Sequence, residues 1–248
     1  MGYLGIDTSC YTTSVAYLDG EKLAEKRKIL TVPQGKRGLR QSEALFQHLG
    51  NLPRLLEELH PGKIAAVARS LAAGLNCPFF ATSHQEGHLW AGLWSSQFKP
   101  PESWLAFHVS GGTTDLLLVQ GQLEKLQTLG GSLDLHAGQF VDRVGVRLGL
   151  PFPAGPQLEL LAKEGRRGGV IFPAPARGCD LSFGGPESQA ARAIEQGAKR
   201  EDVALAVFTA IGRGLVKVLQ KAGSQHGIAS VLFVGGVTAN GKTEAIPC

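Results

Sequence analysis

The sequence predicts an α/β protein built from two similar lobes, each a sheet with attached helical segments. One observation is a repeated plan: two passages separated by about a hundred residues each contain three short strands joined by a polar turn and then a tight turn. The other is that each passage is followed by apolar residues at helical spacing. This pattern favours two lobes with a cleft between them, into which the loops that follow strands would point.

The first passage begins with a short buried strand at Tyr3–Ile6, ends it in a polar turn, and continues with an alternating strand at Ser14–Leu18. An Asp-Gly pair at 19–20 is typical of a hairpin turn, so Lys22–Leu30 is expected to return as a third strand. Apolar side chains recur at helical spacing over Gln41–Leu59. We therefore expect three strands and a helix here.

The second passage repeats this order in the middle of the chain. Strands are expected at Leu105–Val109, Asp115–Val119 and Leu123–Leu129, with a polar turn between the first two. A helix is expected over Ala137–Leu148. Both tight turns are followed by Glu-Lys-Leu, which supports an internal duplication.

The remaining third of the chain is less regular. Pro151–Pro156 is expected to break any helix, and Gly165–Gly185 reads as a loop that carries three arginines. That loop is either a mobile basic lid or a solvated surface loop, and the second interpretation is favoured. A long helix is expected over Ala204–Leu219, followed by a strand at Val231–Val234 that ends in two glycines.

Composition bounds the class of protein. The chain has 248 residues, of which 43% are hydrophobic and 19% charged, and a net charge of +4, which permits a nucleic-acid partner without arguing for one. The four cysteines are scattered without metal or disulfide spacing, which indicates a reducing compartment. We see neither a secretion signal nor a run approaching ~20 apolar residues, so a cytoplasmic protein without a membrane partner is expected.

Two short motifs point to chemistry. His84 and His88 are four residues apart, which on a helix places both imidazoles on one face, within reach of one metal ion. An isolated pair of this kind is more often incidental. Ser110-Gly111-Gly112 follows a strand, and its glycines would let backbone N–H groups approach a phosphate; the simpler alternative is a turn between strands.

Six motifs, taken together and in order, resemble the tRNA N6-threonylcarbamoyladenosine synthase family, once labelled glycoproteases. The resemblance runs from Tyr3 to Asn240. The motifs are Leu4–Cys10, Ser83–His88, Val109–Gly112, Phe140–Arg143 running on to Leu148–Pro151, Asp180–Phe183 and Gly235–Asn240.

The resemblance implies the actin/Hsp70/sugar-kinase fold, with duplicated lobes around a central nucleotide cleft. It assigns residues 1–103 to an N-terminal lobe with the His-x-x-x-His helix and residues 104–248 to a nucleotide-binding C-terminal lobe that is incomplete at its end. The implied activity moves a threonylcarbamoyl group from threonylcarbamoyl-AMP to the tRNA adenosine beside the anticodon. Implied ligands and partners are Fe²⁺ or Zn²⁺, an ATP- or AMP-type nucleotide, tRNA, and a homologous subunit or second copy bound through the N-terminal lobe.

The family's site residues map onto this chain by motif. His84 and His88 correspond to the metal ligands, whereas no catalytic residue is assigned. Without the resemblance, Asp142 reads as a solvent-facing carboxylate and His108 as structural or exposed. The positions implied to hold substrate or nucleotide are His108, Val109, Ser110, Gly111, Gly112, Asp142, Gly155, Glu159 and Asn240.

The chain departs from the family at several positions. Tyr11-Thr12 stand where Asp-Glu is usual, Thr113 follows the Ser-Gly-Gly motif, and Gly184 replaces a serine. A glycine- and proline-rich loop is missing near Val67–Leu71, and Lys242–Cys248 offers no equivalent of the family's third metal ligand, an aspartate. These differences weaken the expected metal site.

Two functions therefore remain open. One is an N6-threonylcarbamoyladenosine synthase, and the other is a non-catalytic nucleotide-binding paralogue that acts as partner or scaffold of an active homologue. A serine hydrolase is rejected because no Gly-x-Ser-x-Gly elbow surrounds Ser9, Ser110 or Ser182. A metalloprotease is disfavoured because the His-x-x-x-His pair lacks the glutamate of His-Glu-x-x-His.

Overall fold

The computed structural model describes residues 2–9, 11–33, 38–61, 64–66, 76–96 and 98–237. The chain divides into two compact units, Met1–His84 and Gln85–Cys248. The sequence placed the lobe boundary at residue 103. In the structure the helix before that point packs on the second unit's sheet, so the division falls earlier.

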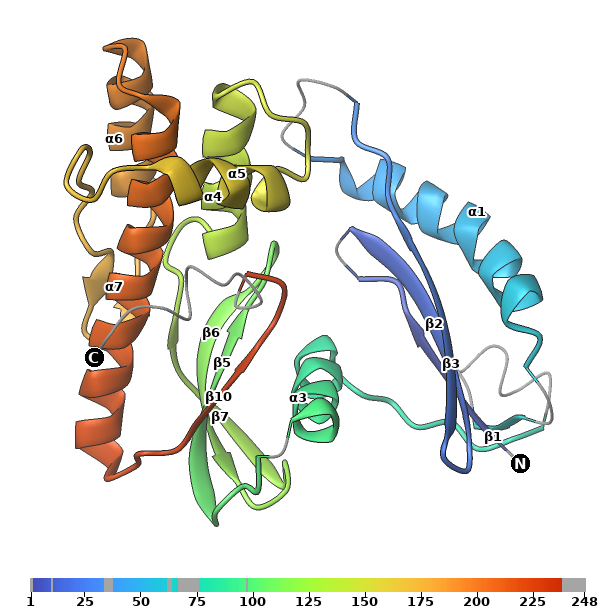
Figure 1. Cartoon of the computed structure of the whole chain (residues 1–248). Helices are drawn as coiled ribbons and strands as arrows, with labels where there is room; N and C mark the ends of the chain where they lie inside the picture. The colour runs from blue at the N-terminus through green and yellow to red at the C-terminus, as the bar shows by residue number, and fades with distance from the viewer. Residues whose placement is uncertain are drawn as a thin grey trace. The chain divides into compact units, whose positions relative to one another are not determined.

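In its described part, the first unit is a four-stranded sheet with helix α1 packed on it (Figure 1). Its strands are β1 (Gly2–Asp7), β2 (Thr12–Asp19), β3 (Lys22–Ile29) and β4 (Ile64–Ala66), in the order β3-β2-β1-β4. The first three pair antiparallel, while β4 pairs parallel to β1. Helix α1 (Gln41–Leu59) packs on β2 and β3. The predicted strands and helix of the first passage are confirmed.

The core that the described residues of the first unit form is small. Leu4, Val15, Leu55 and Leu59 form its buried apolar cluster. All eight residues of β3 are exposed. This follows from the sequence of β3, in which charged side chains interrupt the alternation needed for a buried face.

The second unit repeats the same sheet. Strands β5 (Ser103–Val109), β6 (Thr114–Gln120) and β7 (Lys125–Gly131) pair antiparallel, and β10 (Val231–Val234) pairs parallel to β5, giving the order β10-β5-β6-β7. In both sheets an antiparallel three-stranded meander gains a fourth strand parallel to its first strand. The internal duplication predicted from sequence is therefore present in the topology.

Helices cover both faces of the second sheet (Figure 1). Helix α3 (His84–Ser95) packs on one face through Leu89. On the other face, Leu105, Phe107 and Val109 join a large cluster with four helices. These helices are α4 (Ala137–Arg147), α5 (Gly155–Glu164), α6 (Gly184–Glu195) and α7 (Arg200–His226).

Three features of the second unit differ from expectation. The long helix α7 begins and ends outside the predicted Ala204–Leu219. Helices α5 and α6 were missed because their first turns contain Gly-Pro and Gly-Gly-Pro, which read as breakers, although proline is tolerated at a helix start. The basic segment 165–185 includes a two-stranded hairpin, β8 (Ala176–Arg177) and β9 (Asp180–Leu181).

The basic segment is anchored to the second unit. Phe172 is buried in the large cluster, and the backbone N–H of Arg166 donates to Asp202 at 2.7 Å. The side chains of Arg166 and Arg177 are exposed. This arrangement supports the interpretation as a solvated surface loop.

Candidate metal and nucleotide site

Helix α3 carries the two motif histidines on one face. The helix begins at His84, and His88 lies one turn later, so the helix itself places the two imidazoles side by side. Leu89, which is 0% exposed, packs on Trp104, Ala106 and Leu117 of the second sheet. Because Leu89 is next to His88, this packing turns the start of α3 toward the end of β5.

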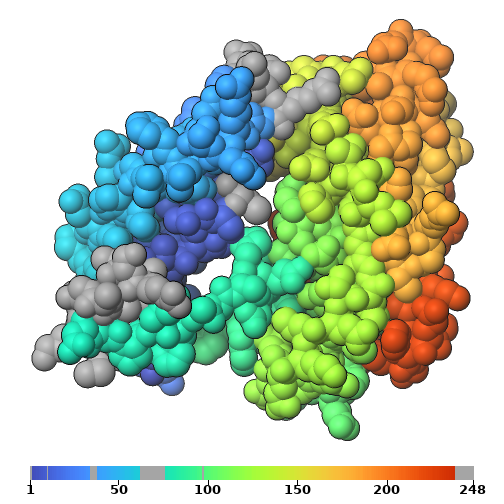
Figure 2. Space-filling view, turned by 180° about the vertical axis from the view of Figure 1, so that it is seen from behind, coloured from blue at the N-terminus to red at the C-terminus, as the bar shows by residue number. Residues whose placement is uncertain are grey.

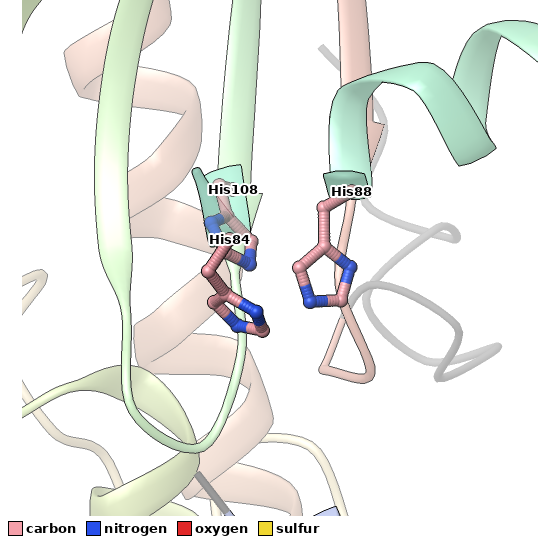
Figure 3. Close-up of side chains that lie close together, drawn as sticks. All are labelled: His84, His88 and His108. Carbon is pink, nitrogen blue, oxygen red and sulfur yellow. The ribbon is translucent and has the colours of Figure 1, made fainter. Parts of the chain in front are cut away.

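Strand β5 contributes a third histidine to the same place. Alternation along β5 sends Phe107 and Val109 to the α4–α7 face, and Ala106 to the α3 face. His108, which is 0% exposed, is therefore directed to the α3 face, where its ring centroid lies 4.4 Å from that of His88. Figure 3 shows the three side chains next to one another.

The three histidines form a candidate metal site. One ligand atom from each of His84, His88 and His108 lies within 4.8 Å of the others, and the described part of the chain holds no second group of three or more His, Cys, Asp or Glu of this kind. Imidazole nitrogen is a preferred ligand of zinc, iron and other transition metals. The donor set thus fits a divalent transition metal.

Sequence reasoning missed the place of His108 beside the other two histidines. The spacing of histidines along the chain indicated a structural or exposed residue, and the resemblance placed it with the nucleotide; the structure shows it fully buried. The available signal was the strand alternation, which predicts that His108 shares a face with Trp104 and Ala106.

A contact within the second unit fixes the first turn of α3. Gln85 Nε2 donates to Asp115 Oδ2 on β6 at 2.5 Å. Asp115 is the cross-strand partner of His108, so the two residues lie on one face of the sheet. Burial raises the pKa of the Asp115 carboxyl, an effect that the Gln85 hydrogen bond and the nearby His136 reduce but do not cancel.

His84 is the last residue of the first compact unit, and its ring also has hydrogen-bonding partners in that unit. Its Nδ1 lies 2.7 Å from Ser9 Oγ and 3.2 Å from Asp7 Oδ2. Burial raises the pKa of Asp7, but the hydrogen bonds from Ser9 and the neighbouring His84 together outweigh it, and the net pKa is lowered. An ionised carboxylate at this position orients the His84 ring.

The Ser-Gly-Gly turn follows directly from the histidine on β5. The backbone N–H of Ser110 donates to Thr113 O at 2.8 Å, which closes the turn. The first residues of α4 lie against it: a Cβ on Gly138 would come within 2.5 Å of Gly111 Cα. A Cβ on Gly111 itself would meet nothing within 4 Å. Protein packing therefore leaves the space above Gly111 open, as a phosphate cradle requires.

The turn after β10 braces the same loop from another side. Gly235 has a φ of +106°, and a Cβ there would lie 2.3 Å from Val109 O. The N–H of Val237 donates to Val109 O at 3.2 Å. Asn240, predicted to lie beside the adenine, is outside the described residues.

Helices α4 and α5 bring three further predicted residues together. Asp142 on α4 accepts the N–H of Ala154 at 2.8 Å and a hydrogen bond from the backbone of Gly155, the first residue of α5. Glu159 lies one turn further along α5. The alternative of a solvent-facing Asp142 is wrong, because this half-buried carboxylate caps the start of α5. Burial raises its pKa, and the two backbone hydrogen bonds only partly offset this.

The structure thus assembles two groups of predicted residues. His84, His88 and His108 lie together and lead into Ser110–Gly112, while Asp142, Gly155 and Glu159 lie on neighbouring turns of α4 and α5. Their assignment to metal and nucleotide stays a prediction. None of the described helices is long and apolar enough to cross a membrane.

Solved structures show the fold. The chain matches the activator of 2-hydroxyisocaproyl-CoA dehydratase from Clostridium difficile with a TM-score of 0.57 and 16% identity, covering 98% of this chain and 83% of that one. It matches full-length HypF with a TM-score of 0.61 and 11% identity, covering 96% of this chain and 49% of that one. Both neighbours have nucleotide-binding domains of the actin/Hsp70/sugar-kinase type, which confirms the predicted fold class.

Sequence relatives show the family. The family model for tRNA N6-adenosine threonylcarbamoyltransferase matches residues 64–246. An enzyme of that name from Thermus thermophilus is 34% identical over 269 residues, covering 97% of this chain and 82% of the relative. Its counterpart from Sulfurihydrogenibium is 33% identical over 274 residues, covering 98% and 80%. The chain therefore belongs to the tRNA N6-adenosine threonylcarbamoyltransferase family.

Proposed function

We propose that this chain is a tRNA-modifying transferase that makes N6-threonylcarbamoyladenosine. The observation that carries the proposal is the 33–34% identity to proteins named for this activity, which extends over nearly the whole chain. A non-catalytic paralogue is not favoured, because the motif histidines and the Ser-Gly-Gly turn are not only kept but gathered in one region.

The proposed reaction is a carbamoyl transfer. The adenine N6 attacks the carbamoyl carbon of threonylcarbamoyl-AMP, the new N–C bond forms as the bond from that carbon to the phosphate oxygen breaks, and AMP leaves with the electron pair. The attacking nitrogen loses one proton. No described residue is assigned as the base that accepts this proton. A negative charge develops on the leaving AMP, and the chain must provide hydrogen-bond donors that stabilise it.

His84 and His88 are proposed to hold a divalent metal, Fe²⁺ or Zn²⁺. Their placement on one face of α3 supports this, as does the preference of both metals for imidazole. When bound, the metal would supply positive charge for oxygen atoms of the substrate. Asp7, whose pKa is lowered, keeps its negative charge at neutral pH and would hold His84 with its other nitrogen directed away from β1.

The nucleotide part of the substrate is proposed to lie along the second unit. Backbone N–H groups of His108–Gly112 would face the phosphate, since the space at Gly111 is open. Asp142 would accept hydrogen bonds from the ribose hydroxyls, with Gly155 and Glu159 alongside it, and Asn240 would lie by the adenine. The same site would hold ATP or AMP.

A protein partner is proposed for the first unit. Helix α1 lies at the surface of that unit (Figure 2) and exposes three large apolar side chains, Leu45 at 59%, Phe46 at 79% and Leu49 at 62%. An apolar surface of this kind is typical of a protein interface. A homologous subunit or a second copy would cover it. We further propose that the protein acts in the cytoplasm, where tRNA is found.

The test is a reconstituted modification assay. Purified chain is incubated with threonylcarbamoyl-AMP and an unmodified tRNA whose anticodon is followed by adenosine, with and without Zn²⁺ or Fe²⁺, and the nucleosides are analysed by mass spectrometry. The modified nucleoside is expected with wild type and with His226→Ala, a variant of an exposed histidine, and not with His84→Ala/His88→Ala. Metal-loaded, folded wild type that leaves the tRNA unmodified, also with a homologous partner added, would contradict the proposal.

A further inference from the structure

We infer that helix α7 binds the phosphate backbone of tRNA through a basic ridge formed by Arg213, Lys217 and Lys221. The inference rests on the proposed function, from which it takes tRNA as the partner, and it assigns a surface of the chain to that partner. The three side chains are exposed and follow one another at intervals of four residues, so they lie along one face of the helix. Because an α-helix rises about 1.5 Å per residue, the basic ridge extends over ~12 Å.

The charge of the basic ridge is not balanced on its own helix. From residue 203 to the end of α7 at His226 the sequence contains no aspartate or glutamate, so the ionic side chains there are all positive. None of the three ridge residues forms an ion pair with another residue of the described ranges. By contrast, the exposed cation Lys26 of the first unit has an acidic partner in Glu58 at 3.8 Å. A run of exposed cations along one helix face is the electrostatic pattern that binds a nucleic-acid backbone.

The hairpin β8-β9 lies along the same part of α7. At one end, a Cβ on Gly214 would come within 2.8 Å of Pro175 Cδ, so the start of the hairpin packs directly on the helix. At the other end, Cys179 Sγ donates to Gln225 Oε1 at 3.4 Å. The hairpin therefore runs beside the helix between residues 214 and 225, next to the basic ridge.

The hairpin contributes a further cation, Arg177. This residue is exposed and lies between Pro175 and Cys179, the two residues through which the hairpin contacts α7. Its cross-strand partner Asp180 accepts the backbone N–H of Gly131 at 3.1 Å, so that carboxylate lies against β7. Two neighbouring elements thus present positive charge on one surface of the second unit.

The basic ridge is separate from the proposed nucleotide site. Helix α3 packs on one face of the second sheet through Leu89, whereas α7 packs on the other face, so the sheet lies between them (Figure 1). Since the sheet and the body of α7 intervene, a mononucleotide held at the Ser-Gly-Gly turn does not reach the basic ridge. A partner that contacts both must be a macromolecule, and tRNA is the macromolecular substrate of the proposed reaction.

The test measures binding of full-length, unmodified tRNA without threonylcarbamoyl-AMP, so that it does not depend on transfer. Fluorescently labelled tRNA is titrated with wild type and with Lys217→Ala/Lys221→Ala at several salt concentrations. The variant is expected to bind about tenfold more weakly at low salt. The slope of log K against log salt concentration should be smaller by about 1.5, since each lost phosphate contact removes about 0.7–0.9. Arg177→Ala should weaken binding to a smaller extent.

A matched variant controls for net charge. Lys125→Ala/Lys163→Ala removes the same charge from two exposed lysines that are each next to a glutamate in the sequence, and it should bind tRNA as wild type does. AMP affinity should be the same in all these proteins. An equal loss of tRNA binding in both double variants would overturn the inference, because net charge alone would then explain the effect.

A measurement on wild type keeps the test valid if a variant does not fold. Lysines are acetylated with and without bound tRNA and identified by mass spectrometry, and protection is expected at Lys217 and Lys221 but not at Lys125. Unchanged tRNA affinity in a folded Lys217→Ala/Lys221→Ala protein would overturn the inference. Protection of these two lysines by vesicles of anionic lipid and not by tRNA would overturn it as well. Binding that depends on the basic ridge in a protein that leaves tRNA unmodified would uphold the inference while contradicting the proposed function.

Discussion

The two sheets of this protein have the same topology and different surroundings. Each is an antiparallel meander with a fourth strand parallel to the first. The first carries α1 and a four-residue buried cluster, whereas the second is covered on both faces and joins a much larger core. The described site residues, apart from His84, belong to the second unit. Among the described residues, the first copy has the smaller core, and the copy with the larger core holds most of the proposed site.

A threonine near the start of the second strand has a related role in both units. Thr13 on β2 is hydrogen-bonded to His48 at 2.8 Å and to Asn51 at 3.3 Å, both on α1. Thr114 on β6 accepts the N–H of Ala137, the first residue of α4, at 2.9 Å. In each case a 0% exposed hydroxyl joins the sheet to the helix that follows the third strand.

The largest expected effect concerns the two cores. Leu116→Ala on β6 and Leu4→Ala on β1 remove the same atoms from a large and a small cluster. Within the ~2–5 kcal/mol typical of buried Leu→Ala changes, we expect Leu116→Ala near the upper end and Leu4→Ala near the lower. Denaturant unfolding, with hydrogen exchange to locate each loss, measures this. Equal losses would show that the first unit depends on packing beyond its small cluster.

The next effect tests the paired threonines. Thr13→Val and Thr114→Val should each lower the free energy of unfolding by about 1–3 kcal/mol, because each removes the hydroxyl oxygen to which buried polar groups are hydrogen-bonded. Thr114→Val should in addition weaken AMP binding, since it frees the start of α4 beside the Ser-Gly-Gly turn. Calorimetric titration with AMP separates the two variants. Equal AMP affinity in both would remove Thr114 from the support of the site.

A smaller effect is expected at Asp142, which has no counterpart assigned in the first unit. Asp142→Asn should weaken nucleotide binding about tenfold, or about 1.4 kcal/mol, by removing a charged acceptor. Burial raises the pKa of Asp142 above its ordinary value, so wild-type affinity should fall as the pH decreases through that raised pKa. Affinity measured against pH should lose this step in Asp142→Asn. A step that persists in the variant would assign the titration to another group.

The smallest expected effect is the loss of stability when the N-terminal cap of either of two helices is removed. Helix α1 is capped locally, with Glu43 accepting the N–H of Arg40 at 3.1 Å. Helix α6 is capped from a distance by Asp134, which accepts from Ser182 Oγ at 2.7 Å, Phe183 N at 2.8 Å and Gly184 N at 3.0 Å. Asp134→Ala should cost about 1 kcal/mol and Glu43→Ala less, measured by thermal unfolding.

The Asp134 effect should depend on pH. Partial burial raises the pKa of this largely exposed carboxyl, but the hydrogen bonds from Ser182, Leu135, Gly184 and Phe183 outweigh that effect, and the net pKa is lowered. Its contribution is therefore complete above the unfolded pKa of about 3.9 and is lost as pH falls through the folded value. Wild type and Asp134→Ala should converge in stability at strongly acidic pH. A constant difference at every pH would mean that the charge of Asp134 has no part in the cap.

The sequence was sufficient wherever local patterns decide structure. Alternation and an Asp-Gly turn located β1 to β3, and the repeat of that plan located β5 to β7. Prediction from the sequence failed where a residue distant along the chain determines the local structure. Helix α6 opens with Gly184-Gly185-Pro186, and its cap is supplied by Asp134, about fifty residues earlier. The place of His108 beside His84 and His88 was missed for the same reason, since those two neighbours come from another element.

The parallel pairing of β10 with β5 has a consequence for synthesis. Strand β5 ends at Val109 and its partner begins at Val231, so the β5 edge stays open until nearly the whole described chain has left the ribosome. At ~5–20 residues per second this lasts on the order of 10 s. An apolar strand edge exposed for that time is a site for wrong pairing between nascent chains. In the cell, the yield of this protein should therefore depend on a chaperone that shields the β5 edge during translation.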